Sequence, residues 1–266
     1  MSVKTFELID YEVQGRIAWV TINNPERMNA LSAGVVNGLW YAFDEVAKDD
    51  DVLVAVLIGG GGKAFCAGAD LKAMTERDHS VGTSEAGAER QNLNGLGKVS
   101  ECPKPIIAAI DGYALAGGMQ LSSRCDIRIC TDKSRFGMPE VRRSLVAAGM
   151  EDTAERFVPT GEAMWILLTA EHMTSARAYD IGFVQSVVTD RPALIEEVTR
   201  IATAITRNAP LAVQAVKKIV QGTRHMSHHD ALEFRNALNE KVERSEDRLE
   251  GPKAFAEKRE PNWKMR

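Results

Sequence analysis

One short apolar run constrains the fold of this chain more than any other feature. Val52–Ile58 is an unbroken series of aliphatic residues, with three aspartates before it and four glycines after it. Such a run predicts a strand that is covered on both faces, which is typical of a parallel sheet flanked by helices. Ile106–Ile110, Ile127–Cys130 and Arg16–Ile22 also have the composition of strands. The sequence therefore predicts an α/β fold.

Helical spacing separates these strands and dominates the C-terminal part. Ser32 predicts the N-cap of a helix that ends at Lys48, because apolar residues then recur every three or four positions. The last predicted helix has an apolar face that includes Phe234 and Leu238, which either packs within the chain or forms a subunit interface. Beyond residue 160 the spacing predicts helices at 163–168, 175–181, 193–207, 211–220 and 228–248, and a strand at 183–188.

Length and charge limit the domain organisation and the partners. The 266 residues suffice for a core over residues 1–190 and a helical region over 191–266. The 33 basic and 37 acidic residues give a net charge of −4, which provides no general attraction to nucleic acid or to an anionic membrane. The four cysteines lack the spacing of a metal site or a disulfide scaffold, and no apolar run is long enough to span a membrane. These features predict a cytoplasmic protein without a bound metal.

Two glycine-containing segments, Lys63–Lys72 and Asp111–Leu121, lie at the same kind of position in the predicted fold. Each follows a predicted strand and precedes a helical stretch. Small residues at such a turn let a substrate oxygen approach free backbone amides. Either segment alone is more often explained by tight packing. As a pair they could form an oxyanion hole that stabilises the enolate of a thioester.

Five segments, in this order, carry a family resemblance. They are Arg27–Ser32, Ala64–Asp70, Lys104–Gly118, Phe136–Glu140 and Ala254–Trp263. Together they resemble the crotonase (enoyl-CoA hydratase/isomerase) superfamily along nearly the whole chain. The resemblance implies a superhelix of ββα turns, C-terminal helices that build homotrimers or dimers of trimers, and an acyl-CoA substrate. It implies no cofactor other than the coenzyme A of that substrate.

The resemblance also implies a set of site residues. The amides of Ala69 and Gly117 would form the oxyanion hole for the thioester oxygen. Without the resemblance, Lys258 and Arg259 near the C-terminus are simply exposed charges. The residues that would lie along the CoA of the substrate are Ala67, Gly68, Asp70 and Leu71. Two further residues, Phe255 and Lys258, would reach the CoA phosphates bound by a neighbouring subunit.

The reaction type depends on two positions. Hydratases of the superfamily use two glutamates, three and twenty-three positions after the oxyanion glycine, which are Gln120 and Glu140 here. An amide has no acid–base function near neutral pH, so Gln120 weakens a two-carboxylate hydration mechanism. Glu140 could still move a proton alone, as in superfamily members that resemble Δ3,Δ2-enoyl-CoA isomerases. The alternative for Glu140 is a structural ion pair with Arg142 or Arg143.

Other residues are outside candidates. Glu151 and Asp152 could face the acyl group or could be acidic residues at the start of a helix. Cys66 and Ser122 have no histidine at a recognisable spacing, so we expect them to be packing residues. The segment Lys72–Lys98 has few large apolar residues and is either a mobile loop beside the site or a surface insertion.

We expect an acyl-CoA-processing enzyme of the hydratase/isomerase type, with Glu140 as the main acid–base group. A catalytically inactive CoA-binding paralogue is the alternative that the loss of a carboxylate at Gln120 permits. An RNA-binding relative would need a basic helix, whereas the first predicted helix carries one lysine and two acids.

Overall fold

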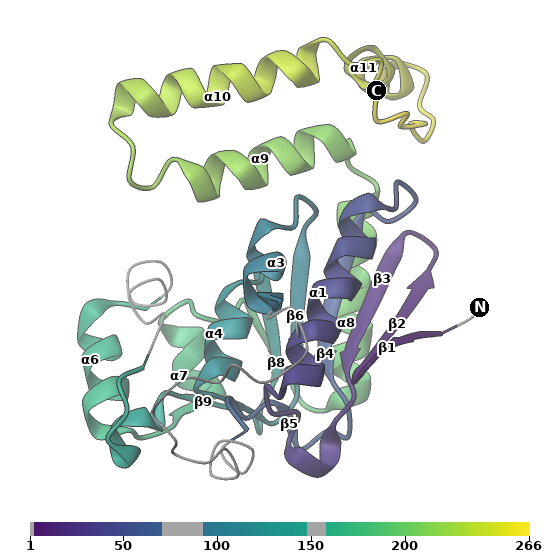
Figure 1. Ribbon diagram of the computed structural model, residues 1–266. Coiled ribbons are helices and arrows are strands. Elements are labelled where there is room, and N and C mark those ends of the chain that lie inside the picture. Colours follow the sequence, from purple (N-terminus) through teal and green to yellow (C-terminus); the bar gives the residue numbers. More distant parts are fainter. Residues whose placement is uncertain (1–2, 71–92, 148–157) are drawn as a thin grey trace, which may run out of the picture.

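The computed structural model describes residues 3–70, 93–147 and 158–266, and its centre is a seven-stranded sheet (Figure 1). The strands lie in the order β1-β2-β3-β4-β6-β8-β11. The first three are antiparallel, and β3, β4, β6, β8 and β11 are mutually parallel. Their bounds are Lys4–Phe6, Ile9–Gln14, Ile17–Ile22, Val54–Gly59, Ile106–Ile110, Ile127–Thr131 and Ser186–Val188.

Strand β4 is buried along its entire length, as the apolar run predicts. Val54, Val56 and Ile58 pack with Leu194 and Val198 of helix α8. The alternate side chains of the strand belong to the larger cluster on the other face, with helix α1. Because successive side chains of a strand point to opposite faces, an aliphatic residue is needed at every position.

A second sheet of four strands, β10-β9-β7-β5, carries the parts of the chain that matter most for function. Strands β5, β7 and β9 are parallel neighbours, and β10 is antiparallel to β9. Their carboxyl ends therefore lie at one edge of the sheet. The bounds are Ala64–Cys66 for β5, Tyr113–Leu115 for β7, Arg135–Gly137 for β9 and Met173–Thr174 for β10.

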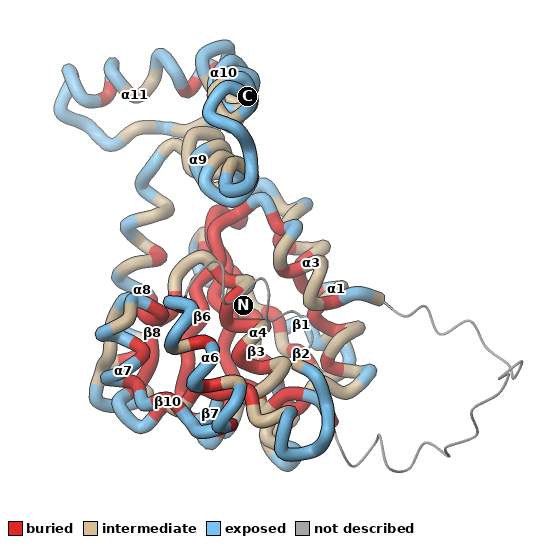
Figure 2. The backbone as a smooth tube through the Cα atoms, turned by 90° about the vertical axis from the view of Figure 1, so that its left-hand side faces the viewer, coloured by how far each residue is buried: buried red, intermediate tan, exposed pale blue. Residues whose placement is uncertain are grey.

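Helices cover the sheets in layers. Helix α8 packs against β3, β4, β6 and β8, whereas α9, α10 and α11 form a separate layer beyond the end of the large sheet (Figures 1 and 2). The division of the chain at residue 190 remains a prediction. The helices are α1 (Ala33–Lys48), α3 (Gly95–Glu101), α4 (Gly117–Ser123), α6 (Thr160–Thr169), α7 (Ser175–Asp180), α8 (Arg191–Thr206), α9 (Pro210–Gly222), α10 (His228–Glu243) and α11 (Asp247–Ala256), with the short 3₁₀ turns η1 (Pro25–Arg27) and η2 (Pro139–Arg143).

The structure bears out several local predictions. The hydroxyl of Ser32 accepts a hydrogen bond from the amide of Val35 at 3.4 Å and so caps α1. Cys66 and Ser122 are fully buried, as expected of packing residues. No described helix has both the length and the apolar composition that a membrane crossing requires.

Three predictions of secondary structure were wrong. The predicted helix 228–248 is two helices, because the helix is interrupted between Glu243 and Asp247. The side chain of Asp247 is buried there and accepts hydrogen bonds from the amides of Lys264 and Met265, which turns the tail back on α11. The predicted strand 183–188 begins only at Ser186. Residues 95–98, assigned to the irregular segment, form the start of α3, while residues 71–92 of that segment lie outside the described residues.

Candidate active site

Three loops meet at the edge where β5, β7 and β9 end. Ala67–Asp70 follow β5, Ala116 and Gly117 follow β7, and Met138–Glu140 follow β9. Because these strands are parallel neighbours, segments that are up to about seventy positions apart in the chain come together. The structure thus unites the two glycine segments with the segment that carries Glu140.

Gly68 and Gly117 lie in direct contact. A Cβ added to Gly68 would lie 3.1 Å from the amide nitrogen of Gly117 and 2.6 Å from the Cβ of Ala116. The φ of Gly68 is 89°, a left-handed conformation that residues with a Cβ rarely adopt. Both the space and the backbone conformation therefore require glycine at position 68.

The amides beside this contact are available as donors. Neither the amide of Ala69 nor that of Gly117 donates to another described residue. Gly117 is the first residue of α4, and the amides of a first helical turn have no partner within the helix. Ala116 reaches this turn with a φ of 51°, unusual for a residue with a side chain and typical of functional turns.

Glu140 lies in the η2 turn with its carboxylate half-buried. One carboxylate oxygen, Oε2, is buried and has no hydrogen-bond partner among the described residues. Burial raises the pKa of this carboxyl, against smaller lowering effects from its own backbone amide and from the charge of Arg143. Within the described residues Glu140 forms no ion pair with Arg142 or Arg143, so the structural ion pair considered above is absent from this single chain.

Gln120 lies one turn of α4 beyond Gly117 and is half-buried. Its backbone amide donates to the carbonyl of Ala116 at 3.1 Å, which holds it in the helix. Its side chain lines a cavity of about 370 Å³ between α4 and α9. Gln120 therefore borders the cavity, whereas Gly117 and Glu140 are not among its lining residues.

The loop after β5 is held from the side of η1. The Nη1 atom of Arg27 lies 2.8 Å from Oδ2 of Asp70, whose side chain is only 7% exposed. The amide of Leu31 donates to the carbonyl of Gly68 at 2.8 Å, and Ala67 donates to the carbonyl of Met28 at 3.1 Å. These contacts fix the loop that presents the amide of Ala69.

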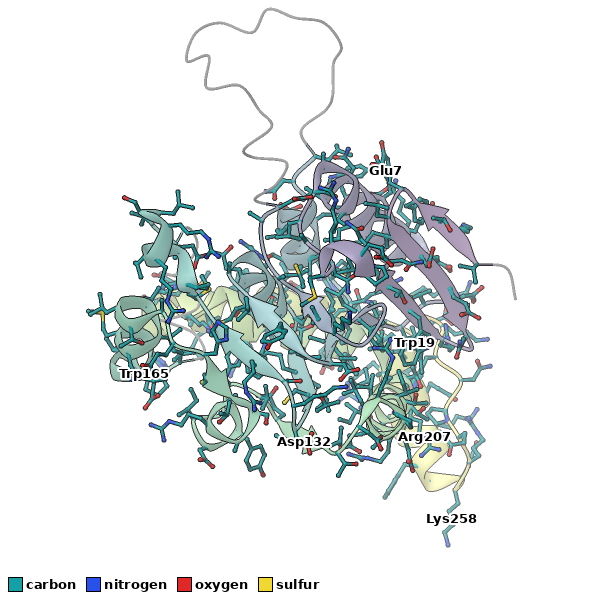
Figure 3. All side chains as sticks on the ribbon, turned by 90° about the horizontal axis from the view of Figure 1, so that it is seen from below. Glu7, Trp19, Asp132, Trp165, Arg207 and Lys258 are labelled. Atoms are coloured by element: carbon teal, nitrogen blue, oxygen red, sulfur yellow. The ribbon has the colours of Figure 1, made fainter. Side chains whose placement is uncertain are left out.

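Phe255 and Lys258 do not lie near this site within one chain. They belong to α11 and the turn after it, at the opposite end of the molecule from β5, β7 and β9 (Figures 1 and 2). Figure 3 shows Lys258 far from Trp165 of α6, the helix that packs against η2. Phe255 is 86% exposed. Only a second chain could bring these two residues to the site, so their contact with a neighbouring CoA stays a prediction.

The remaining candidates fall outside the described residues. These are Leu71, Glu151 and Asp152. Among residues that the structure does describe, no three histidine, cysteine, aspartate or glutamate side chains gather in a way that could hold a metal ion.

Two residues near the site, Asn29 and Arg124, were not predicted from the sequence. Asn29 lies in the segment Arg27–Ser32, and its buried amide group donates to the carbonyls of Gly60 at 3.0 Å and Ala64 at 2.7 Å. Arg124 was also missed. Its position seven residues after Gly117 puts it on the same helix face, a signal that the helical spacing contains.

The comparisons with known proteins identify the class to which this fold and site belong. The family model for enoyl-CoA hydratase/isomerase matches residues 12–266. An enoyl-CoA hydratase of Mycobacterium tuberculosis is 37% identical over 256 residues, covering 96% of each chain. A short-chain-enoyl-CoA hydratase of Clostridium acetobutylicum is 33% identical, covering 93% of this chain and 94% of the relative. The crystal structure of an enoyl-CoA hydratase from Mycobacterium tuberculosis H37Rv superposes with a TM-score of 0.87 at 36% identity, covering 98% of this chain and 100% of that one.

These matches define an α/β enzyme of the crotonase superfamily. The chain belongs to the enoyl-CoA hydratase/isomerase family within it, as the resemblance of the five segments predicted.

Proposed function

We propose that this enzyme binds an acyl-CoA thioester and stabilises its enolate with the amides of Ala69 and Gly117. The observation that carries the proposal is the contact between the Gly68 and Gly117 turns, beside which neither amide has an acceptor among the described residues. Two convergent N–H donors are the arrangement that stabilises an oxygen on which negative charge develops. Ala67, Gly68, Asp70 and Leu71 would then lie along the CoA.

Glu140 is the proposed acid–base group. Its buried oxygen lacks a partner, and burial raises its pKa, which suits a carboxyl group that must both accept and release a proton. The hydrogen bond from Ala116 to Gly137 joins its segment to the Gly117 turn. Gln120 can orient water or substrate through hydrogen bonds but cannot move a proton.

The variant Glu140→Gln tests this assignment. We expect it to lose nearly all turnover of enoyl-CoA thioesters while it still binds CoA thioesters, because the amide keeps the shape and removes the titration. Glu171→Gln, which changes an exposed glutamate on another loop, serves as the matched control. Turnover retained by Glu140→Gln would exclude Glu140 as the principal acid–base group.

A single-carboxylate isomerase is the second candidate, favoured by Gln120. Enoyl-, 3-hydroxyacyl- and dienoyl-CoA thioesters, followed by mass spectrometry, separate the outcomes. Interconversion of double-bond isomers without addition of water indicates an isomerase, and a mass gain of one water indicates a hydratase. Binding without any conversion indicates an inactive CoA-binding paralogue.

We further infer that the protein is a homotrimer or a dimer of trimers. No residue of α10 is buried in the single chain, although its face includes Phe234 and Leu238. Phe255 of α11 is also 86% exposed. Light scattering coupled to size-exclusion chromatography measures the oligomeric state. A monomer would exclude the trimer and also the proposed contact of Phe255 and Lys258 with a neighbour's CoA.

The proposal needs no nucleic acid, membrane or metal partner, and it assigns the enzyme to the cytoplasm. Fractionation of cells that express the full chain tests that location.

A further inference from the structure

One face of α4 carries three groups in a row. Gly117, Gln120 and Arg124 are spaced by three and four residues, so they lie on the same side of the helix. At a rise of 1.5 Å per residue, Arg124 is about 10 Å further along the helix axis than Gly117. The face therefore leads from a free amide, past a carboxamide, to a guanidinium group.

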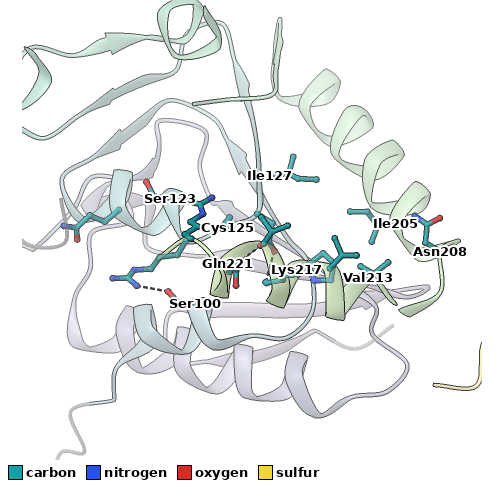
Figure 4. A pocket seen from close by; sticks show the side chains of 16 residues that line it. Ser100, Ser123, Cys125, Ile127, Ile205, Asn208, Val213, Lys217 and Gln221 are labelled. Atoms are coloured by element: carbon teal, nitrogen blue, oxygen red, sulfur yellow. Dashed lines mark hydrogen bonds and ion pairs between the residues drawn. The ribbon is translucent and has the colours of Figure 1, made fainter. Parts of the chain in front are cut away.

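A cavity opens along this face. It has a volume of about 370 Å³ and is lined by Gln120 and Arg124, together with residues of α3, the start of β8, the end of α8 and the length of α9. Figure 4 shows Ser100 and Ser123 at one end of the cavity and Ile205 and Asn208 at the other. The end nearest α4 is thus polar, whereas the far end includes aliphatic side chains.

Positive charge dominates the lining. Among the described residues that line the cavity, Arg124, Lys217 and Arg224 are cationic, and Asp126 is the one acid. Lys217 is matched by that acid, because its Nζ atom lies 2.7 Å from Oδ2 of Asp126. The described lining therefore has more cationic than acidic side chains, and Arg124 is a cation there that forms no ion pair with a described residue, which favours an anionic occupant.

The described residues do not use all the hydrogen-bond donors of Arg124. Its Nη1 atom donates to the hydroxyl of Ser100 at 2.7 Å, drawn as a dashed line in Figure 4. Its Nε atom is buried and has no hydrogen-bond partner, and Arg124 forms no ion pair with any described residue. A buried guanidinium N–H without an acceptor is uncommon in folded proteins, and a carboxylate is the acceptor that fits its planar donors best.

We propose that the substrate is a thioester whose acyl group ends in a carboxylate, and that Arg124 binds this distal carboxylate. This inference rests on the proposed function, because it takes the thioester oxygen to lie at the amide of Gly117. The acyl chain then follows the α4 face past Gln120, and its far end supplies the acceptor that Nε of Arg124 lacks. Arg124 is accordingly a residue that determines specificity rather than one that takes part in the chemistry.

The test compares two saturated CoA thioesters of equal carbon number, one ending in a methyl group and one in a carboxylate. Isothermal titration calorimetry on the full-length protein gives both affinities without turnover, over a series of chain lengths. We expect the carboxylate-ended thioester to bind about 10- to 100-fold more tightly at the length that reaches Arg124, the range of a charged hydrogen bond.

Variants assign the preference to Arg124. In Arg124→Met the ratio of the two affinities should fall close to one, and Arg124→Lys should keep part of it, because it keeps the charge but loses the fork of donors. Arg200→Met removes an exposed arginine of α8 that pairs with Glu197, and it should retain the full ratio. Thermal unfolding of each variant shows whether it is folded.

The outcomes distinguish a failure of the Arg124 site from a failure of the proposed function. Equal binding of both thioesters by the wild type, or a preference that survives in Arg124→Met, overturns the role of Arg124 and leaves the proposed function standing. Absence of binding by either thioester overturns the proposed function, and the carboxylate site with it.

Discussion

The amide of Ala116 donates a hydrogen bond to the carbonyl of Gly137 across 2.8 Å. This bond joins the turn that ends in Gly117 to the strand end that leads to Glu140. Ala116 makes it with a φ of 51°, so the neighbouring structure must hold the turn in this conformation. The Gly117 turn and the segment of the candidate acid–base group are thus joined by a hydrogen bond.

Gly68→Ala should disrupt that unit. The new Cβ would lie 2.6 Å from the Cβ of Ala116 and 2.9 Å from the carbonyl oxygen of Leu115. We expect a loss of about 2–3 kcal/mol in the free energy of unfolding, from overpacking and from a positive φ together. Urea denaturation measures it, and thioester binding should weaken in parallel because the Gly117 amide shifts.

Gly161→Ala is the matched control for that experiment. A Cβ at Gly161 in α6 would meet nothing within 4 Å. The same chemical change there should leave stability unchanged or raise it by up to about 1 kcal/mol, since alanine favours a helix over glycine. An equal loss in both variants would refute the steric account of Gly68.

Stability should depend on pH through Glu140 in a defined direction. Burial raises its pKa above the ordinary value of 4.5, so folding disfavours the charged form. Glu140→Gln removes that cost and should be more stable than the wild type at neutral pH. The difference should grow as the pH rises from 4.5 through the raised pKa and vanish below 4.5. Denaturant unfolding of both proteins across this pH range measures it.

Glu197 provides the opposite sign in the same measurement. Its hydrogen bond to Arg200 lowers the pKa of Glu197, so folding favours the charged form. Glu197→Gln should therefore be less stable than the wild type at neutral pH, and the deficit should disappear in acid. Curves of the same sign for both variants would contradict the assigned environments.

Asn29→Ala should be strongly destabilising although the residue is small. Its Nδ2 atom donates to the buried carbonyl of Ala64 and the partly buried carbonyl of Gly60, and its Oδ1 atom accepts from the amide of Asn24 at 3.0 Å. Removing the side chain leaves these groups unpaired, which should cost about 2–3 kcal/mol. Asn37→Ala, at an exposed bond to Glu7, should change stability by about 0.5 kcal/mol or less. Urea denaturation compares the two.

Gln120→Glu tests whether the missing carboxylate limits hydration. If Gln120 stands where hydratases have the glutamate that is missing here, the variant should hydrate a crotonyl thioester about 100-fold faster, within the range of general acid–base catalysis. Stopped assays with analysis of the 3-hydroxyacyl product measure the rate. If hydration does not rise, the position is not the limiting difference.

The parts of the fold that were predictable from sequence depend on local patterns. Ile106–Ile110 forms a strand with the predicted bounds, because a run of aliphatic residues between prolines and a glycine has few alternatives. The cap at Ser32 was predictable for the same reason. The break after Glu243 was not, because it depends on hydrogen bonds between Asp247 and the tail, about seventeen residues further on.

By itself, the sequence determined the α/β class, the family and the residue types at the site, since these follow from periodicity and from motifs that are continuous in the chain. The tertiary structure alone decided that Gly68, Gly117 and Glu140 come together, because parallel pairing of β5, β7 and β9 joins segments with long separations. It also decided that Oε2 of Glu140 is buried without a hydrogen-bond partner among the described residues and that Nε of Arg124 is buried beside a cavity. Burial and satisfaction of a polar atom depend on everything packed around it, and no local pattern encodes them.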